Sequence, residues 1–248
     1  MLVRTDADGA LAIGQLSHAW LSGQLARAWG NDRFPAPDPR EGIALGAEQH
    51  DVGWALFDLQ AGLSAETGLP RSFLELSAKE HLEIWSGAPD RLRSASAHAA
   101  LVVSLHGSSL SELRLHGADQ GNEELQRYVE RERERQASLR AALALSEQDT
   151  DVIRRQMWTW DGLSLALCNG WEPFTARDVP ALDGLVEIEL RRTGTEASFT
   201  LDPWPFSVSA LEVRCEARRL AGRYPDEQAM QRALQDADPL TLAFVLSA

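Results

Sequence analysis

The chain has 248 residues, enough to enclose one sizeable hydrophobic core or one domain with a smaller appendage. Its formal net charge of −13 would repel the phosphate backbone of nucleic acids, which argues against a nucleic-acid partner. The sequence contains no run of 18 apolar residues, and its first residues lack a basic stretch followed by an apolar block. We therefore expect neither a membrane span nor a secretory signal.

The two cysteines, Cys168 and Cys215, lie in separate segments without the spacing of metal ligands. We expect them to be reduced thiols in a cytoplasmic protein. Lys79 is the only lysine among 24 basic residues, and this preference for arginine suggests a bacterial source. A small anionic substrate is compatible with the acidic composition if a metal ion or local arginines reverse the charge at the site. The oligomeric state stays open.

The first two thirds of the chain has the apolar periodicity of helices. Helices are predicted over 13–29, from Glu41 past Trp54, over 73–85, from Asp90 past Leu110, over 122–144 and over 149–168. The interleaved charges of 122–144 indicate a helix that faces water.

After Gly170 the hydrophobic pattern changes to the period of two that is typical of strands. Strands are predicted over 186–190, 197–201, 211–217 and 240–246, with a short helix over 225–234. The predicted fold is mainly α (α+β), a helical bundle with a small C-terminal antiparallel β-sheet appendage. Residues 1–178 would form the helical domain, and residues 179–248 would form a β-rich appendage packed on it.

His50 and Asp51 stand side by side on an apolar helix face, next to the small side chains of Ala47 and Ala55. An imidazole and a carboxylate in an apolar setting are costly unless something binds them. Both are good ligands for a divalent metal ion. The pair therefore indicates a metal site.

Three more polar residues fall on apolar helix faces: His18, His106 and Asp161. Each has an ordinary explanation: a histidine bonded to a carbonyl, a group at a helix end, or a salt bridge to Arg154 or Arg155. Each uncompensated buried polar group costs about 1–3 kcal/mol. Separate, unrelated reasons for the burial of all these residues are therefore a weaker explanation than a shared partner. We expect all of them to meet His50 and Asp51 at one metal site in the bundle core.

The order His18, His50-Asp51, Asp161 resembles the HD superfamily of metal-dependent phosphohydrolases. The resemblance implies an HD-like bundle in which these four residues bind one metal ion.

In HD members with two metal ions, a histidine from a middle helix joins the ligands. His106 matches this role best, with His98 and His81 as alternatives. Val52 stands where many members have a second aspartate, which weighs against two ions.

The chain also resembles an uncharacterised bacterial family, the DUF3891 proteins, over nearly its whole length. The matching stretches are 15–19, Trp29-Gly30, 50–54, 101–107, 161–165 and 203–206. This second resemblance implies no activity.

From the HD resemblance we expect hydrolysis of a small phosphoester by a metal-activated water, with one or two ions of Fe, Mn, Zn or Mg. Asp51 would bridge two ions, and His106 would complete a second ion's ligands or bond the substrate. Asp58 would orient an imidazole. Trp54 and Trp160 are candidate pocket walls, although ordinary core positions are the stronger expectation.

Two alternatives stay open. Related helical bundles with the same ligands include di-iron HD-like oxygenases. The chain could also be a non-enzymatic binding module, with or without a stabilising metal ion, that uses its β region as an interaction surface.

Overall fold

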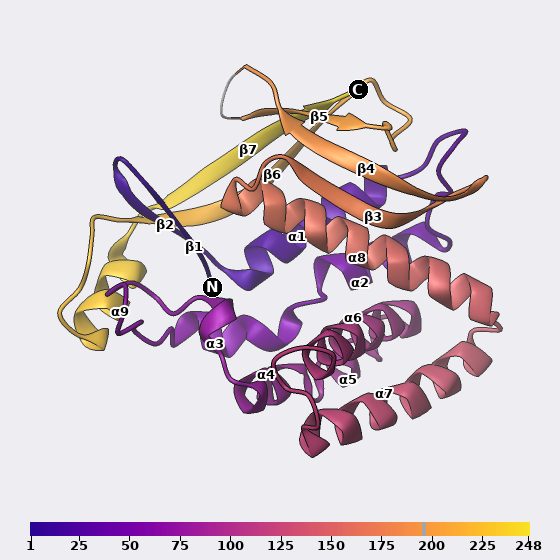
Figure 1. Ribbon diagram of the computed structural model, residues 1–248, viewed down its shortest axis with the longest axis horizontal. Coiled ribbons are helices and arrows are strands. Elements are labelled where there is room, and N and C mark those ends of the chain that lie inside the picture. The colour runs from indigo at the N-terminus through magenta and orange to yellow at the C-terminus, as the bar shows by residue number, and fades with distance from the viewer. Residues whose placement is uncertain (195–196) are drawn as a thin grey trace.

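The computed structural model describes residues 1–194 and 197–248. These residues are 48% helical and 23% strand, and their strands form one curled mixed sheet that covers a whole side of the molecule (Figure 1). The predicted helical bundle with a small antiparallel appendage is therefore wrong. The fold is a sheet with helical layers stacked beneath it.

The sheet contains seven strands within the described ranges, in the order β1-β2-β6-β7-β5-β4-β3. All neighbouring pairs are antiparallel except β5 and β7, which run parallel. The strands are β1 (Leu2–Asp6), β2 (Gly9–Ile13), β3 (Phe174–Ala181), β4 (Gly184–Arg192), β5 (Ser198–Asp202), β6 (Ala210–Leu220) and β7 (Pro239–Ser247).

Helices α1 and α8 lie against the sheet, α2 and α6 come next, and α7 is outermost (Figure 1). The α-helices are α1 (Gln15–Ala28), α2 (Arg40–Glu48), α3 (Ala55–Leu59), α4 (Ala78–Trp85), α5 (Ala88–Leu92), α6 (Ala97–Leu115), α7 (Glu123–Ala142), α8 (Glu147–Asn169) and α9 (Glu227–Asp236). Two short 3-10 helices, η1 (Val52–Trp54) and η2 (Phe73–Glu75), precede α3 and α4.

Two predicted helices are shorter than expected. Helix α2 ends at Glu48, so His50 and Asp51 lie in the turn before η1 and not on a helix. The helix expected from Asp90 is divided into α5 and α6, and α6 begins after Ser96, whose hydroxyl accepts a hydrogen bond from the Ala99 amide.

Strands β1, β2 and β3 were not predicted. In β2, Leu11 and Ile13 face the main core while Ala10 and Ala12 face a second core formed with α9, so the strand is apolar on both sides and does not alternate. In β3 the pairing with β4 shifts between Ala176 and Val179, which breaks the regular period.

The main core joins α1, α2, α6 and α8 to the inner face of the sheet. Phe206 is 2% exposed and packs edge-on against Trp29 of the segment after α1, with ring centroids 5.5 Å apart. Cys168 on α8 and Cys215 on β6 are free thiols, and their sulfur atoms lie 3.7 Å apart across this core. The sequence spacing gave no sign of this proximity.

The proposed boundary between residues 178 and 179 falls inside β3. The N-terminal β1–β2 hairpin pairs with β6, so both parts of the chain contribute to one sheet. The division of the chain into these two parts stays a prediction.

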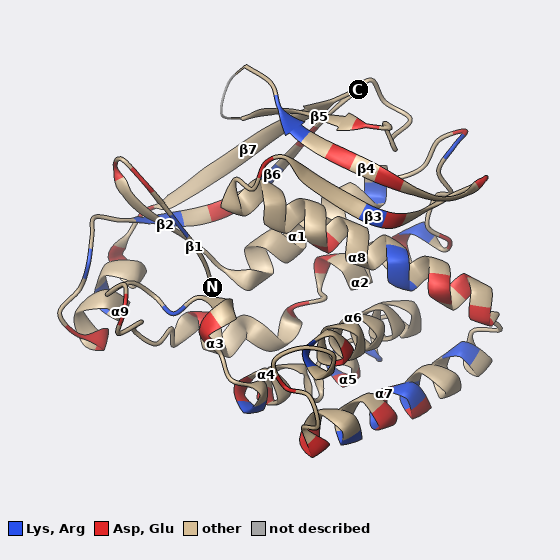
Figure 2. Cartoon of the chain, viewed as in Figure 1, with Lys and Arg blue, Asp and Glu red and all other residues tan. Residues whose placement is uncertain are grey.

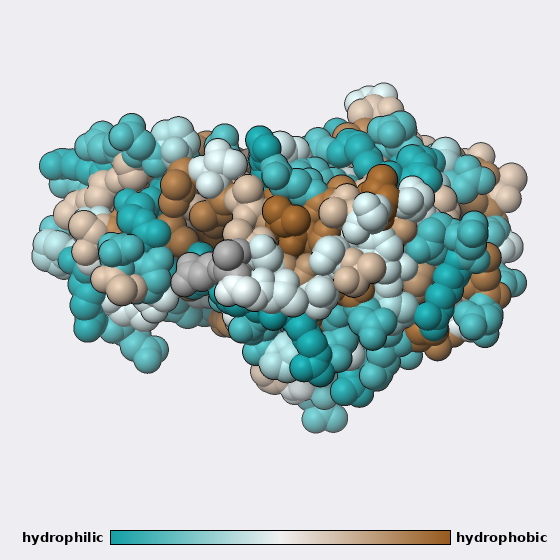
Figure 3. Space-filling model, turned by 90° about the horizontal axis from the view of Figure 1, so that it is seen from above, coloured by the Kyte–Doolittle hydropathy of each residue, from teal (hydrophilic) through white to brown (hydrophobic). Residues whose placement is uncertain are grey.

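Acidic and basic residues are interleaved along α7, which turns most of its surface to water (Figure 2). Seen from above, the surface has an apolar strip bordered by hydrophilic residues (Figure 3). Among the described residues, no helix combines the length and the apolarity that a membrane crossing needs.

Candidate metal centre

The five predicted metal ligands come together in the molecular interior. His18 comes from α1, His50 and Asp51 from the turn after α2, His106 from α6 and Asp161 from α8. All five are buried, and Asp161 is the most exposed at 8%. Segments far apart in the sequence therefore meet at one point.

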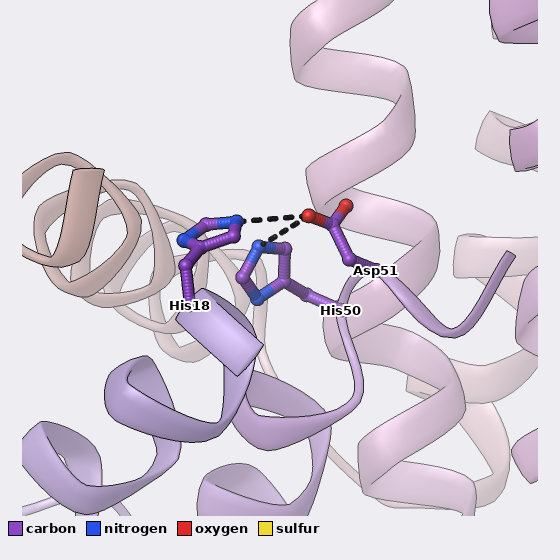
Figure 4. Close-up of side chains that lie close together, drawn as sticks. All are labelled: His18, His50 and Asp51. Carbon is purple, nitrogen blue, oxygen red and sulfur yellow. Dashed lines mark hydrogen bonds and ion pairs between the residues drawn. The ribbon is translucent and has the colours of Figure 1, made fainter. Parts of the chain in front are cut away.

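The potential ligand atoms are close enough to share one ion. His50 Nε2 lies 3.5 Å from Asp51 Oδ2 and 3.4 Å from Asp161 Oδ1. His18 Nε2 lies 2.9 Å from Asp51 Oδ2 and 3.9 Å from Asp161 Oδ1. Both imidazoles point at the same Asp51 oxygen (Figure 4). Nitrogen ligands about 2.1 Å from a tetrahedral ion stand about 3.4 Å apart, within the range of these spacings.

The backbone fixes the tautomer of His50. Its Nδ1 lies 2.8 Å from the carbonyl oxygen of Ala47, and a carbonyl only accepts, so Nδ1 carries a proton. In neutral His50 the lone pair is consequently on Nε2, which is buried and has no hydrogen-bond partner within the described residues. A lone pair that faces two carboxylates is unfavourable without a cation between them.

A serine pair fixes His18 in the same way. Ser164 Oγ donates to the carbonyl of Asp161 at 2.9 Å, so it accepts from His18 Nδ1 at 2.8 Å and from Ser22 Oγ at 2.9 Å. The Nε2 of His18 faces Asp51 and shares a 2.9 Å hydrogen bond with its Oδ2. Hydrogen bonds on the far nitrogen of this kind usually orient metal-bound histidines.

The electrostatics of the cluster also call for a cation. Burial alone would lower the pKa of His50 and raise those of Asp51 and Asp161. Attraction between the opposite charges outweighs burial, raising the pKa of His50 to about 10 and lowering the pKa values of both carboxyl groups. In the metal-free protein, a proton on His50 thus compensates the carboxylates.

His106 is the fifth member of the cluster. Its ring centroid is 4.5 Å from that of His50, and burial, followed by the charge of His50, lowers its pKa to about 4. It is therefore neutral at physiological pH, the state in which imidazole binds metals. Its buried Nδ1 has no hydrogen-bond partner in the described part of the chain, and α6 continues to Leu115, so His106 is not at a helix end.

The turn that carries His50 and Asp51 requires close packing around it. A Cβ at Gly46 would lie 2.5 Å from Val102 Cβ on α6, and one at Gly53 would lie 2.1 Å from the Ile84 carbonyl oxygen. Only glycine lets α2 approach α6 and the turn approach α4 this closely. These contacts place the pair beside His106.

The residues present fit a divalent ion. Two carboxylates and three neutral imidazoles carry a charge of −2, which one divalent ion balances. Such an ion would take the place of the proton on His50 and satisfy its Nε2, which has no partner in the described structure. Mixed nitrogen and oxygen ligands suit Zn, Fe or Mn better than Mg, which prefers oxygen ligands alone.

A cavity of about 220 Å³ opens onto the cluster. Four of the five candidate ligands line it, His50 being the exception, and its walls include Trp54, Phe73 and Trp85. Trp54 is therefore a pocket wall. Trp160 is not among the lining residues and packs in the core, its ring centroid 6.0 Å from that of Trp29.

Asp58 and His98 lie elsewhere. Asp58 Oδ2 accepts a 2.6 Å hydrogen bond from the backbone of Gln15 at the start of α1, and no hydrogen bond joins it to a described imidazole. His98 is half-buried against Gly42, outside the cavity lining. Arg154 and Arg155 pair with Asp151, which leaves Asp161 without the salt bridge that was its alternative explanation.

Two contributors, Ser164 and Arg114, were not assigned a role from the sequence. Ser164 orients His18, and its position on the core stripe of α8 was the only signal. His81 and Arg114 line the cavity and are hydrogen-bonded to each other. His81 was a lesser alternative for the middle-helix histidine, and nothing in the spacing of Arg114 pointed to the site.

No curated protein and no solved structure matches this chain. The sequence model of one family, described as "Protein of unknown function (DUF3891)", matches residues 1–222. The looser resemblance to the HD superfamily stays a prediction. Since the match covers most of the sequence, the chain belongs to the DUF3891 family.

Proposed function

We propose that His18, His50, Asp51, His106 and Asp161 bind one divalent metal ion and that the protein is a metal-dependent hydrolase of a small phosphoester. The observation that carries the proposal is the buried Nε2 of His50, which lies between two carboxylate oxygens at 3.4 and 3.5 Å without a hydrogen-bond partner in the described residues.

The cavity supports hydrolysis because it gives water and a small substrate access to the cluster. An ion bound there would polarise a phosphoryl oxygen and acidify a water molecule. No hydrogen bond joins Asp51 Oδ1 to another described residue, so this oxygen is available to accept a hydrogen bond from a water molecule at the site and orient it. The ion would also neutralise the two carboxylates of the cluster, which otherwise repel a phosphate.

Metal content tests the first half of the proposal. Protein purified without chelator should contain about one equivalent of a divalent metal by elemental analysis, and His50→Ala and Asp161→Asn should contain far less. His98→Ala is the matched control, because His98 lies outside the cluster, and it should match the wild type. A metal-free wild type that binds no added Zn, Mn or Fe would refute the proposal.

Turnover tests the second half. We expect the metal-loaded protein to hydrolyse small phosphomonoesters, and His50→Ala to lose this activity along with the metal. Iron together with oxygen-dependent substrate oxidation would favour the oxygenase alternative instead. A bound metal that raises the melting temperature, without turnover of any phosphoester, would favour the binding module.

A further inference from the structure

We propose that Arg114 and His81 form an anion-binding end of the metal-site cavity and hold the phosphate of a small phosphomonoester with an apolar leaving group. The reaction rests on the proposed function, whereas binding of the anion can be tested separately.

Neighbouring side chains hold the Arg114 guanidinium at the cavity and leave one of its nitrogens available as a hydrogen-bond donor. It lies on α6, two turns after His106, and its side chain is 25% exposed. Its Nε donates to Asp119 Oδ2 at 2.7 Å, and its Nη1 donates to His81 Nδ1 at 2.9 Å. No hydrogen bond joins Nη2 to another described residue. The guanidinium is thus oriented in advance, with one nitrogen available to an oxyanion.

His81 adds a second donor. Because Arg114 can only donate, His81 Nδ1 accepts, and the proton of the neutral ring is on Nε2. Burial, followed by the charge of Arg114, lowers the pKa of His81 to about 4, which keeps the ring neutral. The ring is stacked on Trp85 with centroids 4.9 Å apart, and no described residue accepts a hydrogen bond from its Nε2. His81 is 5% exposed and lines the cavity, so this N–H is a fixed donor there.

The remaining lining indicates the size and polarity of the ligand. The walls include Trp54, Phe73, Leu110 and Leu165, which suit an apolar group. The volume of about 220 Å³ is below the ~300–1,000 Å³ that is usual for larger ligands. A phosphate with a small apolar ester group satisfies the guanidinium, the imidazole N–H and the apolar walls together.

Arg114 also has a structural explanation that the test must separate from anion binding. Its contacts with Asp119 and with the Leu76 carbonyl tie the end of α6 to neighbouring segments. Asp119→Asn weakens the contact between Arg114 and the segment after α6. It keeps the guanidinium and removes the negative charge that partly neutralises it. If Arg114 acts only by stabilising the end of α6, Asp119→Asn should weaken anion binding. If Arg114 binds the anion, this variant should bind it as tightly as the wild type or more tightly.

The experiment measures the dissociation constant of phenyl phosphate by calorimetry, with the metal-loaded and with the chelator-treated protein. Arg114→Gln should weaken binding at least tenfold, and His81→Phe, which retains an aromatic ring for stacking on Trp85, should weaken it less. Asp119→Asn should bind as tightly as the wild type or more tightly. Arg133→Gln is the matched control, since Arg133 pairs with Glu112 on the surface, and it should have no effect.

Three results would overturn the inference: unchanged affinity in folded Arg114→Gln, an equal loss in Asp119→Asn, or benzoate binding as tightly as phenyl phosphate. If Arg114→Gln does not fold, as judged by circular dichroism, Arg114→Lys replaces it. Lysine keeps the charge without the planar fork and should also bind more weakly. Metal content is measured on the same samples. Binding that depends on Arg114 in a protein without metal affinity would refute the proposed hydrolase and leave the anion site intact.

Discussion

At the scale of single residues, hydrogen bonds outside the cluster decide which atoms face its centre. The Ala47 carbonyl directs the Nε2 of His50 inward, and Ser164 does the same for His18. Neither acceptor would itself touch a metal ion. Their effect is to prepare the imidazoles as ligands before an ion arrives, so that little reorganisation opposes binding.

Replacing Ser164 tests whether its hydrogen bond to His18 orients that imidazole for metal binding. In Ser164→Ala the buried Nδ1–H of His18 loses its acceptor, which costs about 1–3 kcal/mol. We expect metal affinity to fall about 10–100-fold while the fold is retained. Competition with a chromogenic chelator measures the affinity. Ser111→Ala is the control, because Ser111 is equally buried and, among the described residues, its hydroxyl bonds only Gly107 of its own helix. An equal loss there would contradict the explanation.

The sequence singled out five polar residues that lie together in the structure, because buried polar side chains must find partners inside. It could not predict the role of Asp58. That residue follows Trp54 by one turn, but its carboxylate turns to the start of α1 and accepts from Gln15. The direction of a side chain depends on which backbone amides lie nearby, and periodicity does not contain that information.

At the scale of secondary-structure elements, helix ends and turns determine which side chains each segment directs toward its neighbours. Helix α4, which carries His81, begins with a capping box in which Ser77 and Glu80 bond each other's backbone. Glu80 also pairs with Arg71 at 2.7 Å. The guanidinium of Arg71 and the hydrogen bonds from Ser77 lower the pKa of Glu80 from 4.5 to about 2.

This shift predicts a pH dependence of stability. A carboxyl group with a lowered pKa in the folded state stabilises the protein above its unfolded pKa of about 4.5, and this contribution is lost as the pH falls toward 2. Glu80→Gln should therefore be less stable than the wild type near pH 6, and the difference should shrink below pH 4.5. Urea denaturation at several pH values measures it, with the exposed Glu83→Gln on the same helix as control. A difference that does not change with pH would contradict the assignment.

The β1–β2 hairpin offers a second test at this scale. Gly9 has a φ of +125°, and a Cβ there would lie 2.3 Å from the Leu220 carbonyl oxygen on β6. Gly184 has a similar φ of +132°, and a Cβ there would have no described atom within 4 Å. Gly184→Ala should cost about 1–3 kcal/mol from backbone strain alone. Gly9→Ala should cost more free energy of unfolding, because β2 must also move away from β6. Equal losses in chemical denaturation would show that the close approach is unimportant.

At the scale of the whole molecule, the sheet is completed by both ends of the chain. Strand β2 pairs with β6, and Trp29 packs against Phe206 across the proposed domain boundary. A fragment of residues 1–178 loses β4 to β7 and leaves Trp29, now 0% exposed, partly uncovered.

We expect the full chain to unfold in a cooperative thermal transition. The fragment of residues 1–178 should show no such transition. Removing a partner from a shared core leaves cavities that the rest of the core cannot refill. Thermal denaturation followed by circular dichroism compares the two chains. A cooperative transition of the fragment, with metal bound, would contradict this expectation and support the two-domain division.

What the sequence determined by itself was local: most helices and four strands from their periods, and the polar residues that apolar surroundings force together. What only the tertiary structure decided was which segments pair over long distances. Strand β2 is apolar on both sides because α9, more than 200 residues later, covers its second face. The thiol pair and the Arg114–His81 contact arise in the same way. Such contacts depend on the packing of remote elements, and a one-dimensional pattern records only the burial of each residue and not the partner that buries it.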